Sequence, residues 1–509
     1  MRVETLLRNT AAANPGRIAV TAEETRLSYG VLDDKSDRLA SALLARGVRR
    51  GDRVVVFMEN IWEMTVAVFA VLKAGAVLCP VNPSLKADGL RFVLGDCRPS
   101  AILTQAKYAR LCEEAGRDVP VSLITVVARG AVAIPGVLAF DDCVAEEPDG
   151  LPEAGTGDDL AMIIYTSGST GNAKGVMMTH ANIVAASGSI AAYLENSADD
   201  VILGILPLSF TYGLYQLLVA VRVGARLVLQ KNFAFPHAVL AAARAEGITG
   251  LPLVPTMAAM ILSMKDVEPL PTLRYITNAA AALPTAHVAG LTELFPQACL
   301  YLMYGLTECA RATFLPPEEV DQRPDSVGKA IPGTEVLVVD ETGRSLPAGT
   351  VGELVVRGPH VMQGYWENPA STGAVLRPGP KPGERWLHTG DLFRTDAAGF
   401  LYFVGRKDDI VKVGGEKIAL SQVEAALHAC RGVVAAVVVG VPDPVLGMAL
   451  RAVAVVSDPT LTERDVLRHC AGILPESMVP KSVEFRAELP LTASGKVSRR
   501  LVTEAGEKE

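Results

Sequence analysis

The sequence predicts an α/β protein: a large N-terminal domain with two α/β sheet subdomains and a β-rich subdomain, followed by a small α+β C-terminal domain. The length of 509 residues corresponds to roughly three compact units at about 150 residues each. Half of the residues are hydrophobic, which supplies large cores and excludes a mainly disordered chain. Strand-like apolar runs alternate with helical stretches, which is typical of layers around largely parallel sheets.

The alternation is clearest before residue 326. Short apolar runs bounded by polar or glycine-containing turns predict strands at 54–57, 76–79, 161–165, 201–206, 226–229, 250–254, 274–277 and 299–303. Longer runs with helical spacing predict helices at 63–73, 236–246 and 286–295. No internal repeat interrupts this pattern, so we expect sheets covered by helices.

The pattern changes twice in the second half. After Ser326, short strands at 335–339, 353–357 and 400–404 with Gly/Pro turns predict the β-rich subdomain, and the Pro/Gly run 378–383 predicts an exposed loop. Helices at 420–429 and 463–474 then alternate with strands at 433–441, 451–456 and 482–485. We therefore expect an N-terminal domain at 1–405, with its β-rich part at about 326–405, a polar hinge at 406–409 and a C-terminal domain at 410–509.

Composition excludes several classes of function. The net charge of −8 disfavours a general nucleic-acid binder. The longest apolar runs, 64–72 and 433–441, fall short of the ~18–20 residues that span a membrane. The start, Met1 to Glu4, has no apolar signal core, and none of the eight cysteines forms a Cys-x-x-Cys pair or a Cys/His cluster. We expect a cytoplasmic protein with reduced, mostly buried thiols.

The strongest local signal follows the predicted strand 161–165. The run Tyr165-Thr-Ser-Gly-Ser-Thr-Gly-Asn-Ala-Lys-Gly175 combines glycines, hydroxyls and one lysine. Glycines let the backbone approach a phosphate, while hydroxyls, amides and the Lys174 charge interact with its oxygens. Ala173 and Gly175 stand where a Walker loop requires Gly and Ser/Thr, so the run is a different phosphate-binding loop.

This run resembles the phosphate loop of the adenylate-forming superfamily of acyl-CoA synthetases, peptide-synthetase adenylation domains and firefly luciferase. The resemblance covers essentially the whole chain, with further motifs in the order of that family. They are Leu72-Lys-Ala-Gly-Ala-Val-Leu-Cys-Pro-Val-Asn82, Leu206-Pro-Leu-Ser-Phe-Thr-Tyr-Gly213, Asn278-Ala-Ala-Ala-Ala-Leu283, Tyr304-Gly-Leu-Thr-Glu308, Gly352-Glu-Leu-Val-Val-Arg-Gly358, His388-Thr-Gly-Asp391, Gly405-Arg-Lys-Asp-Asp409, Gly414-Gly-Glu-Lys417 and Leu491-Thr-Ala-Ser-Gly-Lys496. The chain is thereby identified as a member of this superfamily.

The resemblance implies an AMP-forming acid–thiol ligase, which first joins a carboxylate to the α-phosphate of ATP and releases pyrophosphate. Charge builds on phosphate oxygens, so we expect positional and electrostatic catalysis. The implied triphosphate-binding residues are Thr166, Ser167, Gly168, Ser169, Thr170, Gly171 and Lys174. Thr307 is expected at the α-phosphate and Glu308 at Mg²⁺, which prefers oxygen ligands. Lys496 is expected to bridge the incoming carboxylate and the α-phosphate.

The resemblance also implies the rest of the nucleotide site. Tyr304 is expected to stack on adenine, while Asp391 and Arg406 are expected to hold the ribose hydroxyls. The other side of the adenine is expected to be lined by Ala280, Ala281 and Ala282.

For the second half-reaction, the resemblance implies rotation of the C-terminal domain about Asp408. Gly414 and Gly415 are then expected to line a pantetheine tunnel, where a side chain would obstruct the thiol arm. The acceptor is expected to be free coenzyme A or the phosphopantetheine of a carrier protein acting in trans, since no carrier-like attachment site follows Lys496.

The sequence says less about which carboxylic acid is activated than about the nucleotide site. The expected acyl pocket is a mainly apolar slot formed by Phe210, Tyr212, Asn278, Ala279 and Met303. The segment 209–212 lacks the Asp with which amino-acid-activating relatives pair the amine, and Phe210 stands where many acyl- and aryl-CoA synthetases have His. Arg311, just beyond Glu308, is either structural or a partner for a second carboxylate. Two alternatives stay open: an enzyme that passes its acyl-adenylate to another acceptor, and a silent binding module with the same fold.

Overall fold

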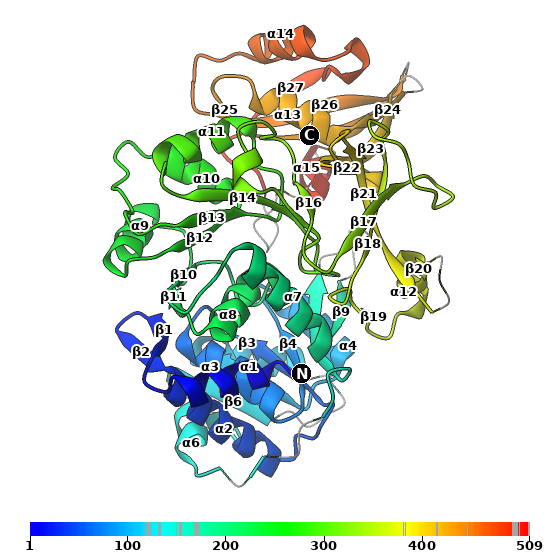
Figure 1. Ribbon diagram of the computed structural model, residues 1–509. Coiled ribbons are helices and arrows are strands. Elements are labelled where there is room, and N and C mark those ends of the chain that lie inside the picture. Colours follow the sequence, from blue (N-terminus) through cyan, green and yellow to red (C-terminus); the bar gives the residue numbers. More distant parts are fainter. Residues whose placement is uncertain are drawn as a thin grey trace.

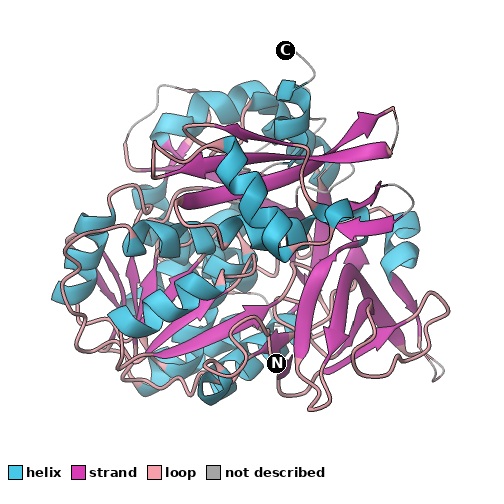
Figure 2. Cartoon of the chain, turned by 90° about the horizontal axis from the view of Figure 1, so that it is seen from above, coloured by secondary structure: helices cyan, strands magenta, loops and turns pink. Residues whose placement is uncertain are grey.

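The computed structural model describes the chain except residues 118, 120–123, 131–133, 149, 152–154, 167–172, 380, 382, 414–415, 445, 491–496, 498 and 507–509. Figure 1 shows the N-terminal elements at one end of the molecule and the C-terminal elements at the other, with β12–β14 and β17–β22 between them. Figure 2 shows the same chain from above, with helices lying over the strands of several separate sheets.

The largest sheet has the order β16-β15-β14-β13-β12-β10-β11-β1-β2. Its strands are β1 (Ile18–Ala22), β2 (Thr25–Ser28), β10 (Val201–Gly204), β11 (Arg226–Leu229), β12 (Gly250–Leu253), β13 (Tyr275–Asn278), β14 (Cys299–Tyr304), β15 (Thr313–Phe314) and β16 (Lys329–Ala330). The strands from β1 to β14 along this order pair in parallel, while β2, β15 and β16 pair antiparallel at the edges. Parallel strands buried on both faces explain their continuous apolar runs.

The second sheet has the order β19-β9-β8-β4-β3-β5-β6-β7. Its strands are β3 (Arg53–Phe57), β4 (Val77–Pro80), β5 (Ala101–Gln105), β6 (Ile124–Ala128), β7 (Leu138–Ala139), β8 (Leu160–Thr166), β9 (Lys174–Thr179) and β19 (Gly364–Tyr365). The short strand β19 comes from far along the chain and adds antiparallel to β9. This pairing brings the segment around Tyr365 to the predicted phosphate loop, which connects β8 and β9.

Helices pack on these two sheets. They are α1 (Glu4–Ala13), α2 (Tyr29–Ala45), α3 (Trp62–Lys73), α4 (Ala87–Cys97), α5 (Ala109–Gly116), α6 (Phe140–Ala145), α7 (His180–Tyr193), α8 (Thr211–Val223), α9 (Pro236–Ala245), α10 (Pro255–Leu262) and α11 (Thr285–Leu294). Every residue of α3 after Trp62 is buried. Since each large apolar side chain contributes roughly 1.5–3 kcal/mol on burial, α3 is held by packing on all sides. Helix α7 begins with a capping box of Thr179 and Asn182.

The β-rich part is an antiparallel sheet in which β17 (Glu335–Val339), β18 (Gly352–Arg357), β21 (Arg385–Thr395) and β20 (Leu376–Pro378) lie in that order and β22 (Leu401–Arg406) pairs with the other end of β21. Helix α12 (Pro369–Val375) precedes β20. The pairing of β21 with β22 sets Asp391 opposite Arg406. Two predicted nucleotide-binding residues are therefore cross-strand neighbours.

The C-terminal elements form their own core. They are β23 (Ile410–Val413), β24 (Glu416–Ala419), α13 (Leu420–His428), β25 (Val433–Asp443), β26 (Gly447–Val456), α14 (Glu463–Ile473), β27 (Ser482–Phe485) and α15 (Arg499–Gly506). Val423, Val438 and Val466 are among the side chains of a hydrophobic cluster separate from the N-terminal one. A separate core is what a small independent domain requires.

The predicted fold class is confirmed, and the predicted helices and strands are present with ends shifted by a few residues. The largest shift is at β26, which begins at Gly447 instead of residue 451 because it pairs with β25 as far as Asp443. Seven of the eight cysteines are buried, as expected of core thiols, and Cys299 is exposed. In the part of the chain that the structure describes, no helix has the length and apolar character to cross a membrane.

Candidate functional site

Thr166 and Lys174 flank the predicted phosphate loop at the ends of a strand pair. They face each other in the register of β8 and β9, and the Thr166 hydroxyl lies 3.5 Å from the Lys174 carbonyl oxygen. The preceding Tyr165 donates a hydrogen bond of 2.6 Å to Asp96, which ties β8 to α4. Five predicted phosphate-binding residues lie outside the described part of the chain: Ser167, Gly168, Ser169, Thr170 and Gly171.

Tyr365 links Lys174, at the end of the predicted phosphate loop, to the predicted metal ligand. The Lys174 ammonium lies 5.2 Å from the centre of the Tyr365 ring, and the Tyr365 hydroxyl donates a hydrogen bond of 2.7 Å to Glu308 Oε1. Burial and the Glu308 charge raise the pKa of Tyr365, so this hydroxyl keeps its proton as a donor. Sequence analysis missed Tyr365, because a lone tyrosine after glycine carries no recognisable chemical pattern.

The turn 304–308, which carries Thr307 and Glu308, has no room for a side chain at position 305. A Cβ on Gly305 would lie 2.4 Å from the Ala310 carbonyl oxygen and 2.8 Å from the Arg311 Cα. Gly305 therefore permits the chain to fold back directly after β14. Both Thr307 and Glu308 are half-buried at this turn, and the Glu308 carbonyl accepts a hydrogen bond of 2.8 Å from Met362 N–H.

Tyr304, Asp391 and Arg406 form a second group beside this turn. The Tyr304 hydroxyl donates a hydrogen bond of 2.6 Å to Asp391 Oδ2, and Arg406 Nε lies 3.4 Å from Asp391 Oδ1. Burial and then Asp391 raise the pKa of Tyr304 well above its usual value. Phe393 packs edge-on against the Tyr304 ring at 4.8 Å between ring centres. These contacts fix the ring plane that the predicted adenine stacking requires.

The groups around Tyr365 and around Tyr304 face the same region. Arg406 lies close enough to Tyr365 to oppose the rise in its pKa. Glu308 and Asp391 both act electrostatically on Cys309, whose pKa burial raises to about 12. The structure therefore brings together Lys174, Glu308, Tyr304, Asp391 and Arg406, which come from four separate parts of the sequence.

The segment 406–409 is anchored on both sides of Asp408. Lys407 Nζ donates a hydrogen bond of 2.8 Å to Glu353 Oε2 on β18, within the N-terminal domain. Asp409 pairs instead with Arg499 on α15, which also bonds Glu424 on α13 at 2.7 Å. Asp408 lies in the short 3₁₀ turn between these anchors. The residues on either side of Asp408 are thus bonded to different domains.

The Glu353 carboxylate, which binds Lys407, is itself held by several hydrogen bonds. Burial alone would raise the pKa of its carboxyl, but hydrogen bonds with His388 at 2.9 Å and with Lys407 bring that pKa down to about 2. Its other oxygen accepts a hydrogen bond of 3.0 Å from Gly390 N–H, directly before Asp391. Glu353 therefore connects the segment 406–409 to the strand that carries Asp391.

The predicted acyl-pocket residues lie at the ends of neighbouring elements. Asn278 is the buried last residue of β13, and Met303 is buried next to the last residue of β14. Ala279 follows β13, and Phe210 and Tyr212 lie at the start of α8. The Tyr212 hydroxyl lies 2.7 Å from the Thr277 hydroxyl, and Tyr193 donates to the Met303 sulfur at 2.9 Å. Asn278 Nδ2 donates to the Ala281 carbonyl at 3.1 Å.

Ala280 follows Asn278 with an unusual backbone. Its φ of +75° lies in the left-handed region, which alanine adopts only under constraint from its surroundings. Ala280 is half-buried, and Ala281 and Ala282 are exposed, so small side chains line an open surface next to Asn278. The remaining predicted residues, Gly414, Gly415 and Lys496, lie outside the described residues.

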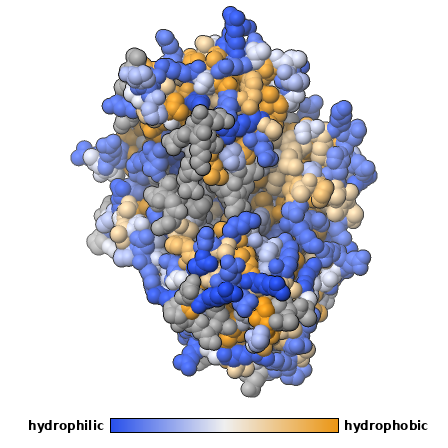
Figure 3. Space-filling view, turned by 180° about the vertical axis from the view of Figure 1, so that it is seen from behind, coloured by the Kyte–Doolittle hydropathy of each residue, from blue (hydrophilic) through white to orange (hydrophobic). Residues whose placement is uncertain are grey.

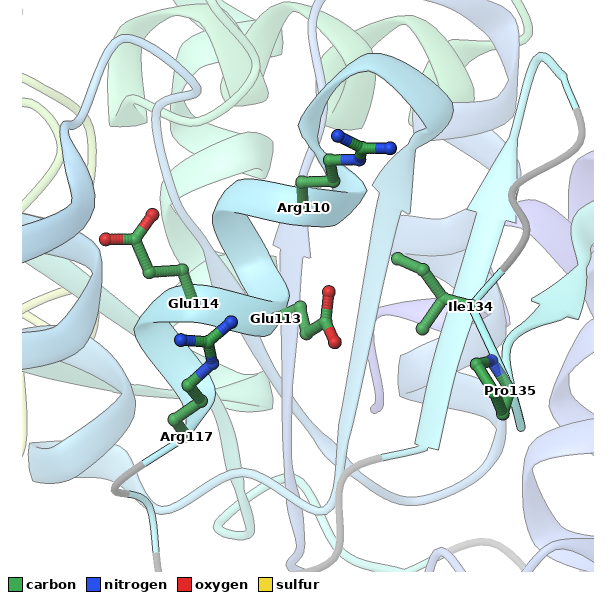
Figure 4. A pocket seen from close by; sticks show the side chains of 6 residues that line it. All are labelled: Arg110, Glu113, Glu114, Arg117, Ile134 and Pro135. Atoms are coloured by element: carbon green, nitrogen blue, oxygen red, sulfur yellow. The ribbon is translucent and has the colours of Figure 1, made fainter.

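One hollow of the outer surface lies apart from the predicted site residues. Figure 3 shows one face covered mostly by hydrophilic side chains, with apolar side chains in separate patches. Figure 4 shows a surface hollow between α5 and residues 134–135, and none of the predicted site residues lines it. Its lining residues are Arg110, Glu113, Glu114, Arg117, Ile134 and Pro135.

Comparison with known proteins gives the family of the chain. Residues 7–366 match the AMP-binding enzyme family, and residues 422–496 match the AMP-binding enzyme C-terminal domain. A feruloyl-CoA synthase from Amycolatopsis sp is 34% identical over 96% of this chain and 95% of its own. A long-chain-fatty-acid–CoA ligase from Escherichia coli is 30% identical, covering 93% of this chain and 89% of its own. The solved structure of the anthranilate CoA ligase AuaEII with anthranoyl-AMP has a TM-score of 0.91 at 26% identity, covering 100% of this chain and 98% of that one.

The fold and these relatives define an adenylate-forming enzyme. The chain belongs to the AMP-binding enzyme family. It is an AMP-forming acid–thiol ligase, which activates a carboxylic acid with ATP through an acyl-adenylate and transfers the acyl group to coenzyme A.

Proposed function

We propose that this ligase uses Mg²⁺ with ATP and takes free coenzyme A as acceptor, with its nucleotide site around Tyr365 and Tyr304. The observation that carries the proposal is the contact of Tyr365 with both Lys174 and Glu308. Through Tyr365, Lys174 at the end of the predicted phosphate loop is connected to the Glu308 carboxylate, whose oxygens can bind a metal ion. We also propose a cytoplasmic location, where ATP and coenzyme A are both available.

Glu308 suits a Mg²⁺ ion that is held mainly by phosphates and water. Such an ion needs only one or two protein carboxylates. Among the described residues, no group of three His, Cys, Asp or Glu side chains gathers as a separate metal site. One Glu308 oxygen accepts from Tyr365, and the side chain is half-buried, so the carboxylate is oriented without being enclosed. When bound, Mg²⁺ would neutralise charge on the phosphate oxygens.

The other residues act by position. We assign Lys174, with Thr166 and the loop 167–171, to the β- and γ-phosphates, and Thr307 to the α-phosphate. Tyr304 stacks on adenine with Ala280 and Ala281 opposite, and Asp391 and Arg406 bind the ribose hydroxyls. Lys496 aligns the carboxylate with the α-phosphate. A carboxylate oxygen then attacks the α-phosphorus, and pyrophosphate leaves as the bridging bond breaks.

In the second step the thiol sulfur attacks the acyl carbonyl carbon, and AMP leaves. The division of Lys407 and Asp409 between two domains supports a pivot at Asp408. We assign Gly414 and Gly415 to the path of the pantetheine arm. The relatives named above use coenzyme A, which favours the free thiol over a carrier protein as acceptor.

The test is a two-step assay. Acid-dependent pyrophosphate release should require Mg²⁺, and AMP with thioester should appear only when coenzyme A is added. A phosphopantetheinylated carrier protein supplied instead of coenzyme A should give little thioester. Pyrophosphate release without thioester from either acceptor would favour an enzyme that passes its acyl-adenylate elsewhere.

Tyr365→Phe should lower acid-dependent pyrophosphate release by about 10-fold and raise the Mg²⁺ concentration needed for half-maximal rate. The variant keeps the ring beneath Lys174 but removes the hydrogen bond that orients Glu308, worth about 1.5 kcal/mol when the acceptor is charged. Tyr108→Phe is the matched control, because Tyr108 donates at 2.9 Å to Glu59 away from the site. Equal effects of both substitutions would contradict a positioning role for Tyr365.

Asp408→Pro should leave pyrophosphate release near normal and lower thioester formation by about 10-fold or more. Proline fixes φ near about −65°, a value within the ordinary range of a 3₁₀ turn, and Lys407–Asp409 forms such a turn. The variant is therefore expected to hold the orientation seen here. Asp408→Ala, which leaves φ free, is the control, and a thermal melt establishes folding. Normal rates in both steps would mean that the pivot lies elsewhere.

A further inference from the structure

Arg311 is a buried cation at the predicted acyl pocket. It lies in the loop between β14 and β15 and is 5% exposed. Its guanidinium carbon lies 4.3 Å from the centre of the Tyr212 ring, and one of its terminal nitrogens donates to the Ala310 carbonyl at 2.8 Å. Stacking on an aromatic face holds the plane of a guanidinium and leaves its edges available for hydrogen bonds.

This arginine differs from the other buried cations of the protein. Arg2 pairs with Glu4 and Asp159, and Lys73 pairs with Asp33 and Asp37. Within the described ranges, Arg311 has no carboxylate at ion-pair distance. The nearest acid in sequence, Glu308, is engaged by Tyr365 instead. Burying a guanidinium without a counter-charge is strongly unfavourable, so a partner from outside the chain is the physical expectation.

The surroundings of Arg311 contain further unused polar atoms. Several buried side-chain atoms lack a hydrogen-bond partner among the described residues. They lie at 209–215, at 278 and at 311–313, in or next to the segments of the predicted acyl pocket. They are Arg311 Nε, Ser209 Oγ, Thr211 Oγ1, Tyr215 OH, Asn278 Oδ1 and Thr313 Oγ1. Buried polar atoms in native proteins are nearly all hydrogen-bonded, so a group of exceptions at one place indicates a polar ligand.

Three tyrosines lie around the Arg311 guanidinium. Burial raises the pKa of Tyr212 to about 12, and Arg311 pulls it in the opposite direction. Arg311 acts in the same way on Tyr215 and on Tyr193, with which it also hydrogen-bonds, so its charge lies among all three rings. Arg311 therefore lies beside Tyr212 and, through Tyr193, close to Met303, and its Nε has no hydrogen-bond partner among the described residues.

We propose that Arg311 binds a second carboxylate of the acid substrate, so that this ligase activates one end of a dicarboxylic acid. The inference deepens the proposed function and rests on it. A carboxylate supplies the missing counter-charge and accepts two parallel N–H bonds from a guanidinium. The hydroxyls of Tyr215 and Thr313 are further donors for the same group. A monocarboxylic acid of equal length would leave the guanidinium buried and unpaired.

The experiment compares acids that differ only at the far end. Succinate with butanoate, glutarate with pentanoate, adipate with hexanoate and terephthalate with 4-methylbenzoate form matched pairs, and 5-oxohexanoate adds a neutral acceptor. Acid-dependent pyrophosphate release gives kcat/KM for each. We expect a diacid to exceed its monoacid partner by about 10²-fold or more, because a site built for a polar group rejects its apolar analogue strongly.

Arg311→Met should collapse the diacid-to-monoacid ratio of kcat/KM by about 10²-fold, and Arg311→Lys should retain part of it. Calorimetric titration of each acid into protein holding a non-hydrolysable ATP analogue reads binding without turnover, and thermal melts establish that each variant folds. Diacid binding should be lost in Arg311→Met.

Three outcomes would overturn the assignment: a preference for monoacids, a ratio unchanged in Arg311→Met, or 5-oxohexanoate used as well as adipate. Failure of the proposed function looks different: pyrophosphate release would then not require Mg²⁺, or no thioester would form with coenzyme A. The binding titrations would still decide the role of Arg311 in that case.

Discussion

Lys496→Ala is expected to lower acid-dependent pyrophosphate release by about 10²–10³-fold while thioester formation from pre-made acyl-adenylate stays near normal. The reason is that Lys496 is assigned to the first half-reaction alone, where its charge aligns the carboxylate with the α-phosphate. After rotation about Asp408, the path through Gly414 and Gly415 would take its place at the site. The two half-reactions are measured separately, the first by pyrophosphate release and the second by release of AMP from added acyl-adenylate and coenzyme A.

The matched control for this lysine lies in the same domain. Lys481→Ala removes the same charge from a surface position paired with Asp443. It should leave both half-reactions unchanged within about twofold, since exposed ion pairs contribute little. Equal loss of both half-reactions in Lys496→Ala would contradict the assignment to adenylation.

Glu308→Gln is the second large effect that we expect. Replacing the carboxylate by an amide keeps the size and one oxygen but removes the negative charge, so pyrophosphate release should fall by about 10²-fold. The Mg²⁺ concentration for half-maximal rate should rise as well, because an amide is a weaker ligand for a hard cation. The fold should be retained, since the Met362 N–H bond to residue 308 uses the backbone carbonyl.

Glu318→Gln provides the comparison for Glu308. It removes the same charge from an exposed position ten residues further along the chain. Its Mg²⁺ dependence and first-step rate should match those of the unaltered enzyme. If Glu308→Gln also kept the Mg²⁺ dependence and the first-step rate of the unaltered enzyme, Glu308 would not be the metal ligand. The hydrogen bond from Tyr365 would then not serve to orient a metal ligand.

These two predictions depend differently on sequence and structure. The assignment of Lys496 comes from its setting in Leu491 to Lys496 alone, because this segment lies outside the described residues. The assignment of Glu308 also began with a motif, but the contact with Tyr365 now gives it a second line of support. For Arg311 the structure supplies most of the argument, because the sequence was compatible with both a structural role and a substrate-binding role.

Most of the fold could be predicted because its signals are local. A buried parallel strand is a continuous apolar run wherever it pairs, and α3 is apolar because it is buried on all sides. The strand ends shifted by a few residues, as at Gly447, because pairing with a partner strand decides where a strand begins.

By itself the sequence determined the fold class and the order of the elements, since apolar periodicity and glycine placement act within a few residues. Only the tertiary structure decided the contacts of Tyr365 and the anchoring of residues 407 and 409 on two sides. It also decided the burial of Arg311 without a carboxylate partner among the described residues. Each of these depends on strands far apart in the chain meeting at one place, as β19 meets β9. Distances and desolvation arise from that meeting, and no local pattern encodes them.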